Sequence, residues 1–175
     1  MKVELHMHTS RYSACATASP QKVLDRARRE GYAAVYLTEH DTLWPAWEIE
    51  QLQAEFPDVR VFPGVELSVG PEGAQHLLVL GATDPAYLEW SDPAAVVERA
   101  RRDGHLTVLA HPFRWRGGAD LLEQTPLPDA LEYLTCSQDG RAARQALDAA
   151  DRLGLPTINA SDAHSVDMVG RYWIE

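Results

Sequence analysis

Short apolar runs alternate with amphipathic segments along this chain of 175 residues. The apolar runs are rich in Val, Leu and Ile and have the length of buried strands. We expect strands within residues 2–7, 33–40, 59–69, 74–81, 105–112, 129–134 and 155–164. The pattern therefore predicts about seven strands distributed over the whole chain.

Helices are predicted between these strands because capping residues frame the amphipathic segments. Ser19 and Pro20 begin one such segment and Gly31 ends it, while Asp92, Pro93 and Gly104 frame another. The expected helical ranges are 19–31, 45–56, 92–104 and 139–154. Alternation of strands with helices predicts parallel strands joined by crossover helices, and hence an α/β fold.

Length and composition fit one globular domain over residues 1–175, with 45% hydrophobic and 24% charged residues. Neither a membrane-spanning run nor a signal peptide is evident, so we expect a cytoplasmic protein with no membrane partner. Two cysteines are too few for a disulfide framework. The formal charge of −10 disfavours binding of long nucleic acid, although bound cations would still admit a small phosphorylated substrate.

Histidines and carboxylates gather where the predicted strands end. The segments "HMHTS", "LTEHDT", "PGVELSV", "QHLLVLG", "LAHPFR" and "NASDAHS" contain six of the seven histidines. In "LHMH", His6 and His8 are two residues apart, so on a strand their rings would point to the same side. Carboxyl ends of strands form the functional face of barrel-like α/β folds, and we expect the side chains to meet there.

Each of these residues alone has an ordinary explanation. A single histidine such as His40 or His76 is more often structural, Glu66 could lie on a solvated strand face, and Asp162 could belong to a turn. Scattered histidines have no reason to fall at successive strand ends, so the joint pattern indicates a site. Imidazoles mixed with carboxylates suit Zn²⁺, Mn²⁺ or iron, and eight candidate ligands suggest at least two ions bridged by a carboxylate.

The motifs "HMH", "TEHD", "GVE", "AHP" and "SDAH" occur in the order seen in the PHP (polymerase and histidinol phosphatase) family, which the chain closely resembles from "LHMHTSRYS" to "SDAHS". The resemblance implies a distorted seven-stranded β/α barrel with two or three divalent metal ions. It implies that His6, His8, Glu66 and Asp162 hold one ion. Glu66 would bridge to a second ion completed by His76 and His111, and His40 with His164 would hold a third.

The third site departs from the family pattern. That ion usually receives another His or Asp from the loop after the first motif, and here the loop reads "TSRYSACATAS". Cys15 lies near this position and could supply a thiolate, or it could be a packed thiol.

Several side chains near the motifs could contact substrate. Arg11, Arg114 and Arg171 could bind phosphate oxygens, and Arg114 in "HPFRW" is the strongest of the three. Trp44 and Trp47 follow "TEHDT" and could flank a ring-bearing substrate or serve the core.

The sequence predicts a metal-dependent hydrolase of phosphoric esters, with Glu66, Asp162 and Arg114 in catalysis. We expect a phosphomonoesterase that cleaves a small phosphorylated metabolite or nucleotide through a metal-bridging hydroxide. Two alternatives stay open: an exonuclease acting on short nucleic acid ends, and a non-catalytic metal-binding module.

Overall fold

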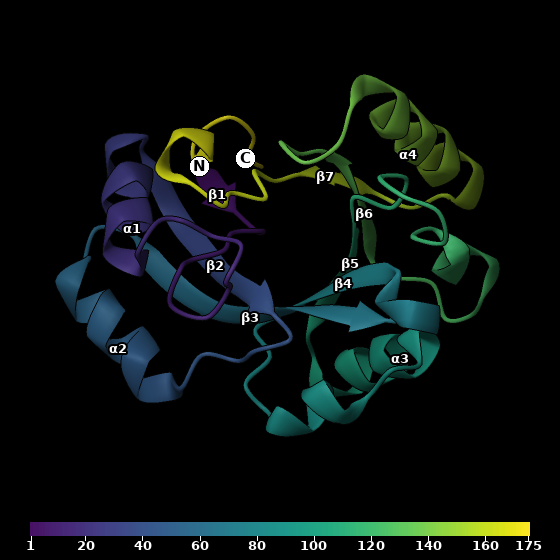
Figure 1. The fold of residues 1–175 in the computed structure, drawn as a ribbon, viewed down its shortest axis with the longest axis horizontal. Helices are drawn as coiled ribbons and strands as arrows, with labels where there is room; N and C mark the ends of the chain where they lie inside the picture. The colour runs from purple at the N-terminus through teal and green to yellow at the C-terminus, as the bar shows by residue number, and fades with distance from the viewer.

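One seven-stranded sheet runs through the computed structural model, which describes residues 1–175 (Figure 1). Its strands are β1 (Lys2–Glu4), β2 (Tyr32–His40), β3 (Arg60–Val69), β4 (Gln75–Leu80), β5 (Leu106–Ala110), β6 (Ala130–Leu134) and β7 (Thr157–Asn159). Spatial order follows sequence order from β1 to β7. All seven predicted strands are present, although the first is shorter than expected because the backbone leaves the sheet before His6.

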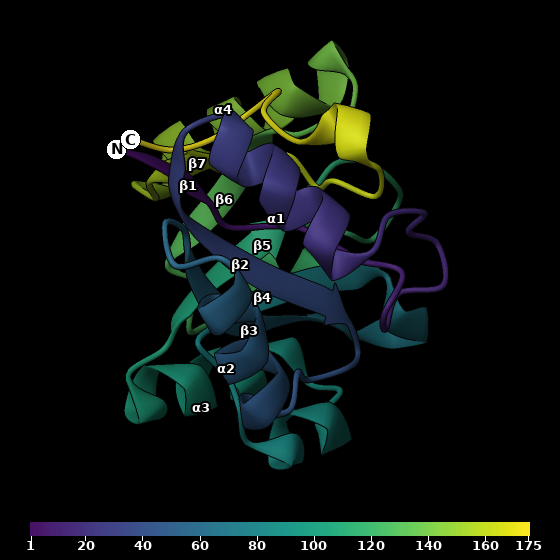
Figure 2. The ribbon, with the colours of Figure 1, turned by 90° about the vertical axis from the view of Figure 1, so that its left-hand side faces the viewer.

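Four helices lie outside the sheet: α1 (Pro20–Arg29), α2 (Ala46–Glu55), α3 (Pro93–Asp103) and α4 (Gly140–Leu153) (Figure 1). Asp92 caps α3 by accepting a hydrogen bond from the backbone N–H of Ala94, and Gly104 ends it in the left-handed conformation at φ 80°. Ser19 precedes α1 without capping it through its side chain. Figure 2 looks onto α1 and α2, which pack on β2 and β3.

The direction of β4 corrects the prediction of an entirely parallel sheet. This strand pairs antiparallel with both β3 and β5, whereas the other four strand pairs are parallel. Only residues 70–74 connect β3 to β4, which is too short for the crossover that a parallel pair needs. Gly70, at φ 74° and ψ −172°, adopts a backbone conformation that is open essentially only to glycine at the start of this tight connection.

The sheet curls until its two ends meet, so the predicted α/β fold with a distorted seven-stranded barrel is confirmed (Figure 1). No ladder joins β1 to β7. Instead, Met7 and Ala163 form an isolated parallel bridge, and Val3 and Ile174 form an isolated antiparallel one. The second bridge places the two chain ends side by side, as both views show. None of the helices is long and apolar enough to cross a bilayer.

Apolar side chains between the sheet and its helices stabilise this arrangement. One buried cluster joins α1 and α2 to the sheet and includes Val23, Leu24, Leu37 and Leu52. A larger cluster packs α3 and α4 against the sheet. The clusters bury the apolar faces of the helices, which leaves one edge of the barrel free for polar side chains.

Leu24→Ala should reduce the free energy of unfolding by about 2–5 kcal/mol, because it leaves a cavity beneath α1. Urea denaturation measures this change. Leu106→Ala is the matched control, since Leu106 is 61% exposed and its truncation should change stability by only about 0.5 kcal/mol. Equal losses in both variants would contradict this view of the core.

Candidate metal centre

Eight residues named from the sequence meet at one edge of the barrel and form what we call the histidine–carboxylate cluster. They are His6, His8, His40, Glu66, His76, His111, Asp162 and His164. Histidines 6 and 8 follow β1, His40 ends β2, His111 follows β5, and Asp162 and His164 follow β7. Glu66 lies within β3, opposite His40 in the ladder.

His76 reaches this edge by a route that the sequence analysis missed. It lies at the beginning of β4 and pairs with Ser68 and Ala110, so it is not at a strand exit. Because β4 runs antiparallel to its neighbours, its beginning lies beside their carboxyl ends. The same reversal that breaks the parallel pattern therefore brings His76 to the cluster.

The first group of candidate ligands surrounds one oxygen of Glu66. Nε2 atoms of His6 and His8 are 2.9 Å apart and lie 3.3 and 3.1 Å from Glu66 Oε2. Both nitrogens also lie 3.3 Å from Asp162 Oδ1. The four side chains assigned to the first ion by resemblance thus converge on one small volume.

The second group surrounds the other oxygen of the same carboxylate. Glu66 Oε1 lies 2.7 Å from His76 Nδ1 and 3.1 Å from His111 Nε2. One carboxylate therefore separates two pairs of imidazoles, which is the position that a bridging ligand requires.

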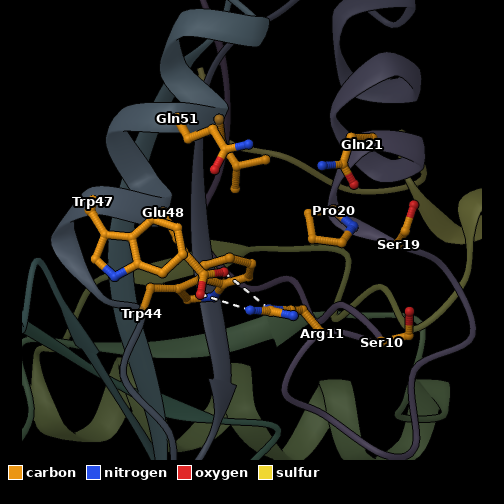
Figure 3. A pocket seen from close by; sticks show the side chains of 10 residues that line it. Ser10, Arg11, Ser19, Pro20, Gln21, Trp44, Trp47, Glu48 and Gln51 are labelled. Atoms are coloured by element: carbon orange, nitrogen blue, oxygen red, sulfur yellow. Dashed lines mark hydrogen bonds and ion pairs between the residues drawn. The ribbon is translucent and has the colours of Figure 1, made fainter.

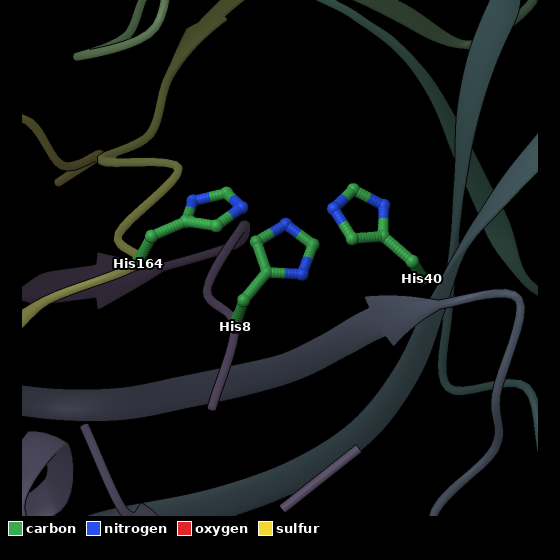
Figure 4. Close-up of side chains that lie close together, drawn as sticks. All are labelled: His8, His40 and His164. Atoms are coloured by element: carbon green, nitrogen blue, oxygen red, sulfur yellow. The ribbon is translucent and has the colours of Figure 1, made fainter. Parts of the chain in front are cut away.

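A third group is formed by His8, His40 and His164, whose rings gather in Figure 4. The ring of His8 lies between the other two, with centroids 4.2 Å from His40 and 4.4 Å from His164. His40 Nδ1 also lies 2.8 Å from Glu66 Oε2, so His40 borders the other groups as well. Cys15 is exposed and belongs to none of the ligand groups, so it is not a packed thiol.

Buried carboxylate oxygens show that these residues fit divalent cations. Glu66 Oε2 and both side-chain oxygens of Asp162 are buried, and none of them accepts a hydrogen bond of good geometry, although imidazole nitrogens lie 2.8 Å from Glu66 Oε2 and 3.3 Å from Asp162 Oδ1. Such charged oxygens are strongly destabilising unless a cation or a donor compensates them. The neighbouring ring nitrogens are suited to divalent transition metals. The ligand atoms of His6, His8 and Glu66 lie within 4.8 Å of one another, and so do those of His40, Glu66 and His76 and those of His8, His40 and His164.

Backbone strain marks two residues of the cluster. His111 has φ 29° and Asp162 has φ 48°, values that residues other than glycine rarely adopt. Strain of this kind persists where the surrounding structure fixes a functional geometry.

Electrostatics keep the two carboxylates of the cluster ionised. Burial raises the pKa of Asp162 and Glu66, but the adjacent imidazoles, with His6 foremost, outweigh burial and lower both pKa values below the ordinary range. Burial likewise lowers the pKa of His6, while Asp162, Glu132 and Glu66 outweigh it and raise that pKa. In the metal-free protein the imidazoles and the carboxylates therefore hold one another in their charged forms.

Buried acidic residues that the sequence analysis did not single out hold the histidines in place. Glu132 Oε1 lies 2.9 Å from His6 Nδ1, and Glu132 Oε2 accepts a hydrogen bond from the His111 backbone N–H at 2.8 Å. His8 Nδ1 lies 3.3 Å from the Ser13 hydroxyl, which donates to Glu39 at 2.5 Å. These contacts leave Nε2 of His6 and His8 free to face the cluster. The sequence signal that could have identified Glu132 is its position among the apolar residues of "DALEYL".

Of the three candidate arginines, only Arg114 lies at the cluster. Its Nη1 is 3.9 Å from Asp162 Oδ2, and its guanidinium lies over the Trp115 ring at 4.6 Å. Arg11 pairs instead with Glu48, and Arg171 pairs with Asp167.

Known proteins share both the sequence signature and the fold. The PHP-associated family profile matches residues 140–175. A two-domain protein from Bacteroides vulgatus, described as containing a predicted PHP-like metal-dependent phosphoesterase, superposes with a TM-score of 0.72 at 21% identity, over 95% of this chain and 53% of the other. The chain belongs to the PHP family. An amidohydrolase from Chromobacterium violaceum, solved with bound sulfate, has a similar fold, with a TM-score of 0.76 at 19% identity over 100% of this chain and 92% of the other.

Sequence relatives of this PHP chain include much longer proteins. The error-prone DNA polymerase of Mycolicibacterium paratuberculosis is 32% identical over 171 residues, which is 89% of this chain and 15% of the polymerase. Other error-prone DNA polymerases are matched over 10% of their length. The PHP family and its fold are therefore established.

Glu132→Gln should weaken Zn²⁺ binding about 10- to 100-fold. The two oxygens of Glu132 contact the His6 ring and the His111 backbone N–H, whereas glutamine has only one side-chain oxygen and carries no charge. A zinc titration against a competing chelator measures this. Glu98→Gln is the matched control, since Glu98 is exposed and contacts only Arg102 as an ion pair. Unchanged affinity in Glu132→Gln would show that Glu132 does not orient these ligands.

Glu4 predicts a pH dependence of stability in the metal-free protein. Burial raises the pKa of Glu4 from 4.5 to about 7, although hydrogen bonds from Ser161 and His6 oppose the shift. The folded state therefore holds a proton that the unfolded state releases, and stability falls as pH rises from about 4.5 to about 7. The shift corresponds to about 3 kcal/mol.

Glu4→Gln should remove this contribution, because the amide imitates the protonated acid. Urea denaturation of both proteins across this pH range gives the difference in their free energies of unfolding. Parallel pH profiles for the two proteins would show that Glu4 does not retain its proton on folding.

Proposed function

We propose that this PHP protein is a phosphomonoesterase that hydrolyses a small phosphorylated metabolite or nucleotide. The observation that carries this proposal is the convergence of imidazole nitrogens on buried carboxylate oxygens of Glu66 and Asp162 that accept no well-formed hydrogen bond. A purely structural cluster would satisfy these oxygens with hydrogen bonds. The free lone pairs of these oxygens could instead bind the divalent cations of a metal-assisted hydrolysis.

Divalent cations bound by the three ligand groups would activate water near neutral pH and neutralise phosphate charge. The chain's own residues supply the rest. Glu66 would hold two ligand groups at a fixed separation, while Glu132 and the Ser13–Glu39 pair fix the rings of His6 and His8. Such fixed geometry places the reacting groups without reorganisation during the reaction.

Arg114 would bind a phosphoryl oxygen. Its side chain is 38% exposed, so a substrate can reach it, and its closest carboxylate oxygen lies 3.9 Å away. The stacked Trp115 ring restricts the guanidinium without neutralising it. Arg114 can therefore orient the phosphate and stabilise charge that develops on its oxygens.

A second candidate function, trimming of short nucleic acid ends, is favoured by arginines that extend beyond Arg114. Two adjoining cavities of about 360 and 450 Å³ share Arg114 and Arg141, and Arg116 lines the second. These cations could contact further phosphates of a short strand. A third candidate is a non-catalytic metal-binding module, and the resemblance to part of a DNA polymerase is compatible with it. The presence of all eight candidate ligands favours catalysis instead.

Asp162→Asn should lower phosphate release from p-nitrophenyl phosphate at least about 100-fold and reduce the metal content, because it removes a charged ligand of the cluster. Elemental analysis and phosphate release are measured on the same Mn²⁺- or Zn²⁺-loaded samples. Asp167→Asn is the matched control, since Asp167 is exposed and pairs with Arg171.

The outcomes separate the three functions. Turnover that is lost only in Asp162→Asn supports the phosphomonoesterase. Turnover of bis(p-nitrophenyl) phosphate or short oligonucleotides, with none of the monoester, favours the exonuclease. Stoichiometric metal without turnover of any ester favours the non-catalytic module and overturns the proposal.

A further inference from the structure

A separate cavity of about 430 Å³ lies between α1 and α2 (Figure 3). Gln21 of α1 and Gln51 of α2 lie on opposite sides of it, and Trp47 lies at one rim. The volume falls within the range of small-molecule sites. None of the residues of the histidine–carboxylate cluster lines this cavity.

The cavity shares two loops with the histidine–carboxylate cluster. Ser10 and Arg11 follow His8 directly in the chain, and Trp44 follows His40 by four residues. Since consecutive Cα atoms are about 3.8 Å apart, the Cα of Ser10 lies within about 7.6 Å of that of His8. The cavity and the histidine–carboxylate cluster are therefore neighbours that border the same two loops.

The lining of the cavity carries no net charge. Its two charged residues are Arg11 and Glu48, and they neutralise each other. Arg11 donates two hydrogen bonds to Glu48 at 3.0 and 2.9 Å, and the Tyr12 hydroxyl donates a third at 2.7 Å. Since no cation is left over, the lining does not suit a second phosphate, and an uncharged group fits it better.

The side chains around the cavity suit a flat ring with polar edges. Trp47 is 61% exposed although it is large and apolar, and Trp44 behind it is almost wholly buried and packs edge-on against Tyr12. The amides of Gln21 and Gln51 make only long contacts of 3.4 Å to Glu55. An amide presents one donor and one acceptor together, which matches the edge of a nucleobase.

We propose that this cavity binds the uncharged heterocyclic ring of the substrate, so that the substrate is a nucleotide whose base stacks on Trp47. Gln21 and Gln51 read the polar edge of the base, and the phosphate lies at the histidine–carboxylate cluster. This inference rests on the proposed phosphomonoesterase function and narrows its substrate class. Trp47 is then a specificity-determining residue with no part in the chemical step.

Binding is tested first, without any reaction. Adenosine is titrated into the full chain, and binding is measured by calorimetry and by the indole N–H signals of ¹⁵N-labelled protein. We expect adenosine to bind and to shift the Trp47 signal. Trp47→Ala should weaken this binding at least about fivefold, the lower end of base–aromatic stacking, and Trp47→Phe should retain most of it. Because Trp47 is exposed, neither substitution should disturb folding.

Kinetics then separate this inference from the proposed function. With the metal-loaded protein, Trp47→Ala should lower kcat/KM for adenosine 5′-phosphate at least about fivefold and leave that for ribose 5-phosphate unchanged. Leu88→Ala, at an exposed residue outside this cavity, is the control and should change neither value. Equal effects of Trp47→Ala on both substrates, or no binding of adenosine, would overturn the inference even if phosphate is released. Adenosine binding that depends on Trp47, in a protein that hydrolyses neither ester, would instead overturn the proposed function and leave the binding site standing.

Discussion

The buried carboxylate of Glu66 is the point on which the site depends. One of its oxygens lies within 3.3 Å of rings from His6, His8 and His40, and the other lies within 3.1 Å of His76 and His111. Removing a carboxylate from water is strongly unfavourable unless positive charge or donors replace the lost solvation. The fold supplies five imidazoles from four strand ends to a single side chain, which explains why residues far apart in the sequence must meet at this edge.

This requirement also gives a role to the irregular parts of the barrel. A β4 strand running parallel to its neighbours would carry the beginning of the strand, with His76, to the opposite edge of the sheet. The short 70–74 connection reverses the chain and keeps His76 beside Glu66. Closure between β1 and β7 through only the Met7–Ala163 bridge has a similar effect, since it leaves His6, His8 and Asp162 outside regular pairing and free to turn inward.

The elements that could be predicted were those with a local signal. Helices framed by Pro20 or Asp92 have capping chemistry, and the paired histidines of "HMH" have a spacing that places both rings on one side. The direction of β4 depended on pairing partners, which local periodicity does not encode. Glu132 and Glu39 were missed because a single glutamate in a strand resembles a solvated residue until its buried partners are known.

Charge distribution links the parts of the molecule. A net charge of −10 would repel a phosphorylated substrate over much of the surface. Divalent cations bound at the histidine–carboxylate cluster, together with the arginines beside it, would reverse the field locally. The lining of the cavity between α1 and α2 carries no excess of positive charge, because Glu48 neutralises Arg11. Arg11 was a candidate phosphate ligand in the sequence, yet its ion pair removes it from that role and makes its surroundings electrically neutral. The two sides of the loop after His8 are thus suited to opposite ends of one ligand, the charged end at the cluster and the uncharged ring at Trp47.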